Sequence, residues 1–150
     1  MDTKQQIQKY IFGEIFLIAN KLQTIGDEFL EEVTMKQWFT LVIIDQFFKD
    51  KAPSISEIAE TMGTSRQNVK QIVLKLEKKG FVVISKDEKD SRILRVRNTD
   101  KCIEYWQNRY EKDEEFLQHI FKDMDEEELF QIFNGLCKFY NNISSFKVEK

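Results

Sequence analysis

Residues 54–97 read SISEIAETMGTSRQNVKQIVLKLEKKGFVVISKDEKDSRILRVR, and the pattern of this segment changes three times. Apolar residues recur at helical spacing in a short run that ends at Gly63, and then in a longer run that ends at Gly80. The residues that follow are β-branched or aromatic on both sides of a charged tip, which predicts a two-stranded hairpin. A short helix, a tight turn, a longer helix and a hairpin together are typical of a winged helix-turn-helix, in which the hairpin is the wing.

Outside this segment the sequence predicts further helices. Thr34, Ser54, Thr64 and, more loosely, Asp125 each stand three residues before Glu or Gln, the spacing of a capping box at a helix start. A single Pro and five Gly also favour a helical chain. We therefore expect a mainly α fold with a small β-hairpin wing, with helices at 3–25, 34–49, 54–62, 65–79, 99–121 and 125–145 and strands at Phe81–Ile84 and Ile93–Val96.

Charge is distributed unevenly along the chain. Thr64–Arg97 contains ten basic and four acidic residues and carries a net charge of +6, whereas the remainder carries −9. One basic surface on an otherwise acidic chain is typical of a protein that binds a polyanion. Charge alone leaves open the other interpretation, that these lysines are ordinary solvated helix positions.

The predicted helix at 65–79 has one apolar and one polar face. An apolar stripe runs from Val69 to Leu76 and must face the core, and Gln67 and Gln71 lie nearly opposite this stripe. The first two turns carry no acid, and amide and cationic side chains there can donate to phosphates and base edges. The contacts to DNA expected from this helix are made by Ser65, Arg66, Gln67, Asn68, Lys70, Gln71 and Lys75.

The tip of the predicted wing reads Lys86-Asp-Glu-Lys-Asp-Ser-Arg92. An arginine on a flexible tip can reach the minor groove beside a helix in the major groove, and narrow A·T-rich grooves attract such cations. Asp90 lies two residues before Arg92 and is placed to hold its guanidinium by a charge-assisted hydrogen bond. The contacts expected from the wing are made by Lys86, Lys89, Asp90 and Arg92.

At these positions the sequence resembles the multiple-antibiotic-resistance regulator (MarR) family of bacterial winged-helix proteins. The resemblance implies a dimer with interlocked terminal helices, two recognition helices in successive major grooves and wings in the flanking minor grooves. It also implies that many members release DNA when a small ligand or an oxidant acts on them. Its most specific element is Asp90-Ser-Arg92. The resemblance spans most of the chain and is carried by Ser56-Glu-Ile-Ala59, Ser65, Val69, Leu76, Glu77, Gly80-Phe-Val82, Asp90, Arg92, Val96 and Thr99.

Three positions depart from the pattern of the family. Ile84 stands where members often carry Arg or Lys, so one phosphate contact is missing or is moved to Lys86. Asn98 replaces a usual Leu and Cys102 a usual Gly, which bears on where the fifth helix begins. No Cys precedes Cys102, so the peroxide-sensing mechanism that uses a Cys in the first helix is not expected.

The predicted helices near the two ends of the chain have broad apolar surfaces. These surfaces exceed what one small core can cover, and burial between two copies would cover them; a larger monomer core is the alternative. We therefore expect helical dimerisation regions at 1–33 and 99–150 around a winged helix-turn-helix DNA-binding region at 34–98. A small-molecule effector, if one binds, would lie where these regions meet, although plain core packing is the other interpretation of the aromatic residues there. The candidate lining residues are Phe16, Trp38, Trp106 and Tyr110.

Several classes of protein are disfavoured. The sequence has no phosphate-binding glycine loop, paired-cysteine metal motif or calcium loop, and His119 is its single histidine, so we expect no enzyme, metal or other cofactor. Cys102 and Cys137 are interpreted as buried thiols in a reducing compartment. No apolar run approaches the ~18 residues of a membrane helix, and the N-terminus does not have the pattern of a signal peptide, which favours a cytoplasmic protein.

The prediction is therefore a homodimeric, sequence-specific regulator of transcription. Repression is the first expectation, while activation and a response to a ligand are left open. It would read a pseudo-palindromic, A·T-rich site in double-stranded DNA with a major-groove helix and a minor-groove wing. The alternative is a winged-helix dimer that binds another protein and has little affinity for DNA. The excess of acids outside the basic segment permits that alternative.

Overall fold

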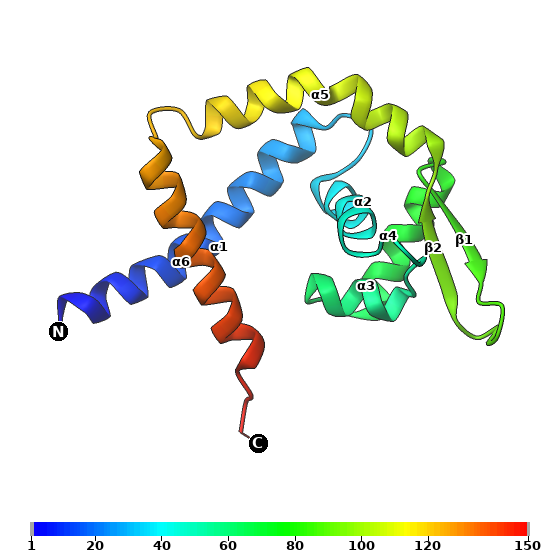
Figure 1. Cartoon of the computed structure of the whole chain (residues 1–150), viewed down its shortest axis with the longest axis horizontal. Coiled ribbons are helices and arrows are strands. Elements are labelled where there is room, and N and C mark those ends of the chain that lie inside the picture. Colours follow the sequence, from blue (N-terminus) through cyan, green and yellow to red (C-terminus); the bar gives the residue numbers. More distant parts are fainter. Residues whose placement is uncertain (1, 150) are drawn as a thin grey trace. The chain divides into compact units, whose positions relative to one another are not determined.

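A computed structural model describes residues 2–149 of the chain (Figure 1). Within this range six helices and one antiparallel hairpin follow one another in the predicted order, so the mainly α fold with a β-hairpin wing is confirmed. The helices are α1 (Thr3–Phe29), α2 (Met35–Phe47), α3 (Ile55–Met62), α4 (Arg66–Lys78), α5 (Asp100–Ile120) and α6 (Glu126–Ser145), and the strands are β1 (Val82–Lys86) and β2 (Leu94–Asn98).

Three helices begin at capping boxes that the sequence predicts. Before α2 the Thr34 hydroxyl accepts from the Gln37 N–H at 3.2 Å, while the Gln37 side chain accepts from the Thr34 N–H at 3.1 Å. Ser54 and Asp125 head equivalent boxes before α3 and α6. Each box satisfies two backbone donors near a helix start, so these starts are determined locally.

The predicted capping box at Thr64 is wrong. The Thr64 N–H still donates to the Ala59 carbonyl at 3.0 Å, so this residue closes α3, which ends at the left-handed Gly63 (φ 71°). The cap of α4 is Ser65, whose hydroxyl accepts from the Asn68 N–H at 3.1 Å. The turn between the two helices is therefore a single residue longer than the capping pattern implies.

The core lies among α2, α3, α4 and the hairpin. The predicted stripe on α4 is buried, and Val69 and Leu76 have no exposed surface. They belong to one cluster with Leu41 of α2 and Ile58 of α3. Gly80 follows α4 in the left-handed conformation (φ 80°), as predicted, and turns the chain into β1. Because the inner side of α4 is buried, its outer side is left facing solvent.

Phe81 closes this core where α4, β1 and α5 meet. Its N–H donates to the Leu76 carbonyl and its carbonyl accepts from the Thr99 N–H, both at 3.0 Å. Its ring meets the ring of Tyr105 edge-on, with 5.3 Å between the centroids. The Tyr105 hydroxyl in turn donates to the Leu30 carbonyl at 2.9 Å. The start of α5 is thus bonded both to the end of α4 and to the end of α1.

The chain divides into two compact units, Met1–Gln107 and Asn108–Lys150, with the boundary inside α5. The first contains α1 to α4 and the hairpin, and the second contains α6. The functional division at 34–98 stays a prediction. Among residues 2–149 no helix combines the length and the apolarity that crossing a bilayer requires.

The apolar faces of α1 and α6 are exposed in the single chain. Only Gly26 of α1 is buried, and no residue of α6 is buried. The exposed large apolar residues of α6 are Leu129, Phe130, Ile132, Phe133, Leu136, Tyr140 and Ile143.

Candidate nucleic-acid interface

The outer face of α4 presents the polar residues that the sequence singles out. Gln67 and Gln71 are exposed, as are Arg66 and Lys70, and the first turn of α4 contains no acid. Asn68 is half-buried, and its side-chain amide donates to the Thr64 hydroxyl at 2.9 Å. This bond engages one amide hydrogen of Asn68 within the turn, so the freely presented amides of the helix are the two glutamines.

The wing turns tightly between its strands. Its register pairs Ile84 with Val96 and Lys86 with Leu94. Next to the last pair, a carboxylate oxygen of Asp87 accepts from two backbone amides of the turn, each at 3.0 Å. Hydrogen bonds to the side chain of Asp87 therefore stabilise the turn at the predicted tip, and they hold the residues that follow in one conformation.

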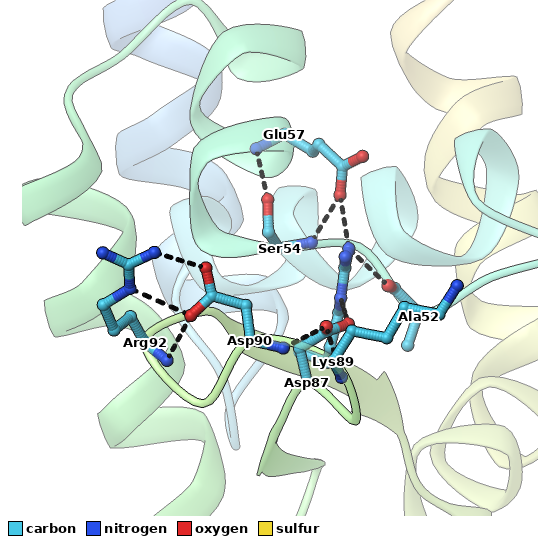
Figure 2. Close-up of polar contacts among 8 residues, drawn as sticks. Ala52, Ser54, Glu57, Asp87, Lys89, Asp90 and Arg92 are labelled. Carbon is cyan, nitrogen blue, oxygen red and sulfur yellow. Dashed lines mark hydrogen bonds and ion pairs between the residues drawn. The ribbon is translucent and has the colours of Figure 1, made fainter.

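Asp90 holds Arg92 as the sequence predicts (Figure 2). The carboxylate accepts from the Arg92 backbone N–H, from Nε and from Nη2, each at 3.0 Å. The hydrogen bond from the Arg92 side chain is the main reason that the pKa of Asp90 lies below its ordinary value. The side chain of Arg92 is nonetheless 89% exposed. The guanidinium is therefore oriented by the protein and open to a ligand.

Arg95 is a residue of this site that sequence reasoning missed. Its side chain is only 14% exposed, and Nε donates to Asp87 Oδ1 at 2.9 Å while Nη1 donates to Glu57 Oε2 at 3.0 Å. From the sequence, Arg95 was only one of the ten basic residues of Thr64–Arg97, and no contact was predicted for it. Its partners lie 8 and 38 residues away, so no local spacing could have identified them.

A cleft of about 710 Å³ brings the helix face and the wing together. Gln67 from α4 and Arg92 from the wing line the same cleft, beside the first residues of α3. The Glu57 carboxylate is in the cleft too, but it is paired with Arg95. The predicted residues Gln71, Lys75, Lys86 and Lys89 are exposed outside this lining. The complete lining consists of Ser54, Ile55, Ser56, Glu57, Arg66, Gln67, Lys70, Arg92, Ile93, Leu94 and Arg95.

Two departures from the family pattern have a structural explanation. Ile84 packs its apolar side chain against the core, and its N–H donates to Glu77 Oε2 at 3.0 Å. Lys86, the replacement proposed from the sequence, is exposed. Asn98 donates from its side-chain amide to the Leu41 carbonyl at 3.0 Å. A polar side chain therefore takes the place of the usual leucine by bonding to α2.

The candidate effector residues lie in different environments. Trp38 and Trp106 are partly buried and pack on the core, whereas Phe16 and Tyr110 are exposed on α1 and α5. None of the four lines the cleft between α4 and the wing. The effector pocket accordingly stays a prediction.

The two cysteines differ. Cys102 is fully buried as expected, and burial raises the pKa of its thiol to about 12, with a smaller effect from the charge of Asp45. The expectation of a buried thiol is wrong for Cys137, which is exposed on α6 because the single chain covers no residue of that helix. Among residues 2–149, no cluster of three metal-ligating side chains is found.

Comparison with known proteins adds an independent finding. Residues 33–94 match the profile of the MarR family. YfiV of Bacillus subtilis, described as an uncharacterised HTH-type transcriptional regulator, is 29% identical over 142 residues, which cover 91% of this chain and 87% of YfiV. BadR of Rhodopseudomonas palustris, described as a transcriptional activatory protein, is 26% identical over 108 residues, which cover 71% of this chain and 62% of BadR, less than two thirds of its length.

A solved structure shares the fold. The crystal structure of the S. aureus MepR–DNA complex matches with a TM-score of 0.74 at 22% identity and covers 89% of this chain and 96% of MepR. At that identity the likeness concerns the fold. The predicted resemblance is confirmed to this extent: residues 33–94 match the MarR family model, and the chain has the fold of MepR.

Proposed function

We propose that the protein is a homodimeric, sequence-specific DNA-binding regulator of transcription that acts in the cytoplasm. The observation that carries this proposal is the shared cleft, in which Gln67 of α4 and Arg92 of the wing face the same space. A duplex seated there would meet a polar helix face in its major groove and a cationic tip in the adjacent minor groove.

The role of α4 follows from its exposed side chains. Gln67 and Gln71 are one turn apart and free of acidic neighbours in the first turn, so their amides can pair bidentately with adenine. Arg66 and Lys70 flank them and supply cations for phosphate contacts. We assign base readout to the glutamines and phosphate contacts to the two cations.

The role of the wing follows from the pair Asp90–Arg92. The pair has no net charge, so its contribution is a guanidinium held in a fixed direction rather than an excess of cations. Narrow minor grooves of A·T-rich DNA attract an arginine inserted in this way. We therefore propose A·T-rich sequences on the outer flanks of the site.

Pairing of two copies is supported by the exposed apolar faces of α1 and α6. A monomer would leave these faces in water, and a two-fold dimer would cover them. A dimer presents two α4 helices, so we propose a pseudo-palindromic site whose half-sites are about 10 base pairs apart, one helical turn of DNA. Binding should weaken steeply with salt because each copy adds phosphate contacts.

Selection of bound fragments from a random DNA pool tests the proposal, since it returns half-site, spacing and symmetry together. A two-fold symmetric motif with A·T-rich flanks is expected. Failure to enrich any fragment at low salt would overturn DNA binding and favour a protein-interaction module. A promoter reporter that carries the selected site then separates repression, the expected effect, from activation of the kind that the name of BadR describes.

A pair of variants tests the wing. Arg92→Ala should weaken binding to the selected duplex by about 10-fold or more while the dimer stays intact, since a minor-groove contact is lost twice per dimer. Arg97→Ala is the matched control, because Arg97 is an exposed arginine of the same hairpin that lines a second cleft with the end of α2. Equal losses in fluorescence anisotropy for both variants would refute the assigned role of Arg92.

A further inference from the structure

Arg95 connects two elements that the proposed DNA complex needs in a fixed relation. Its guanidinium bonds Asp87, in the turn of the wing, and Glu57, in the capping box of α3, and Nη1 also reaches the Ala52 carbonyl at 3.4 Å. Figure 2 labels the three residues whose oxygens accept these bonds, Ala52, Glu57 and Asp87. Arg95 also lines the cleft, but its side chain is only 14% exposed, and three acceptors engage Nε and Nη1.

The contacts continue from Arg95 to the tip of the wing. Asp87 Oδ1 accepts from Arg95, while Oδ2 accepts from the Asp90 N–H at 3.0 Å. Asp90 in turn holds the side chain of Arg92. Every link in this series is a hydrogen bond to a charged group, a stronger class than neutral hydrogen bonds. The direction of Arg92 is therefore connected to α3 through Arg95.

The rest of the hairpin is held to the protein near its base. The Val96 N–H donates to the Pro53 carbonyl at 3.0 Å, and the Ile84 N–H donates to Glu77. A two-stranded hairpin is marginally stable by itself, so the outer end of the wing requires a further contact with the rest of the protein. The bond from Arg95 to Asp87, directly after the end of β1, supplies that tie.

We propose that Arg95 is a positioning residue: it fixes the wing against α3 and so sets where Arg92 meets the minor groove, without touching DNA itself. This inference rests on the proposed function. Positioning of the wing and direct contact with DNA predict opposite changes in DNA affinity when the acidic partners of Arg95 are removed. If Arg95 held a phosphate, removing its two acidic partners would free the cation and strengthen binding, whereas loss of positioning weakens binding.

The test is the double variant Glu57→Gln/Asp87→Asn. Gln at 57 still completes the capping box, and Asn at 87 still accepts from the turn amides, so both local structures persist. The matched control is Glu60→Gln/Glu88→Gln, which removes the same charge from exposed positions in α3 and in the wing turn. The test variant should bind the selected duplex between about 3-fold and 30-fold more weakly than the wild type, which lies within the coupling energies of residues in one ion-pair network. The control should bind equally well or more tightly.

A double-mutant cycle completes the test. Arg92→Ala should reduce the affinity for the selected duplex much less in the test variant than in the wild type, because a guanidinium that is no longer held in place contributes less to binding. The conservative variant Arg95→Lys, whose folding is checked by circular dichroism, should also bind weakly, since a point charge cannot bridge both acids. Equal cost of Arg92→Ala in both backgrounds, or a test variant as tight as its control, overturns the inference. A wild type that binds no duplex would instead overturn the proposed function.

Discussion

Replacing Leu136 with alanine tests whether α6 pairs two copies of the chain. Leu136 lies in the middle of the apolar stripe of α6, and 53% of its surface is exposed in the single chain. Full burial of a leucine side chain contributes about 1.5–3 kcal/mol, so burial of the exposed half contributes about 0.8–1.5 kcal/mol in each copy. Both copies change together, and the dimer should lose about 1.5–3 kcal/mol, a rise of about 10- to 150-fold in its dissociation constant.

Sedimentation equilibrium over a range of protein concentrations measures this constant directly. The control is Asn134→Ala, which truncates an exposed polar side chain on the opposite side of α6 and should leave the constant unchanged. At nanomolar protein the Leu136→Ala variant should also lose affinity for DNA, because monomers present one α4 instead of two. A dissociation constant within about 2-fold of the wild type would show that α6 does not form the dimer interface.

Three further results are expected. Gln67→Ala and Gln71→Ala should each cost about 1–3 kcal/mol on the selected duplex and little on unrelated DNA; equal loss on both would assign them to phosphates. In the Leu136→Ala variant, at a concentration where it is monomeric, a thiol reagent at pH 8 should modify Cys137 rapidly and the native Cys102 hardly at all, because burial raises the pKa of the latter to about 12, and modification of both at one rate would contradict this. The pKa of Glu57 lies below its ordinary value, mainly because it accepts a backbone hydrogen bond at the start of α3. Its contribution to stability is therefore present above that value and lost as the pH falls through the folded pKa, so Glu57→Gln should reduce the fall in melting temperature on acidification.

Much of the fold could be predicted because its determinants are local. The boxes at Thr34 and Ser54 join residues three apart, and the stripe from Val69 to Leu76 repeats within one helix. The ion pair in the wing is also local in sequence, since Asp90 and Arg92 are two residues apart. Patterns within a few residues of each other can be read without knowing the tertiary structure.

The failures involve contacts that sequence spacing does not encode. Thr64 has the capping pattern, but its N–H is still used by α3, so the cap moves to the next residue. Arg95 looks like a surface cation until β2 is paired and its acidic partners approach from other elements. Cys137 was expected to be buried because it falls in a helical pattern, and the single chain does not cover that helix. In each case the outcome depends on which neighbour occupies a position in space.

The arrangement around Phe81 has a consequence for how a signal would travel. Its main chain is bonded at one side to the last turn of α4 and at the other to the residue before α5, and its ring rests on Tyr105. The start of α5 is therefore joined to the end of α4, the helix proposed to read bases, by two main-chain hydrogen bonds and one ring contact. A rearrangement that displaced the start of α5 would therefore act on the end of α4 through these main-chain bonds, and truncation of Phe81 would remove only the ring contact with Tyr105.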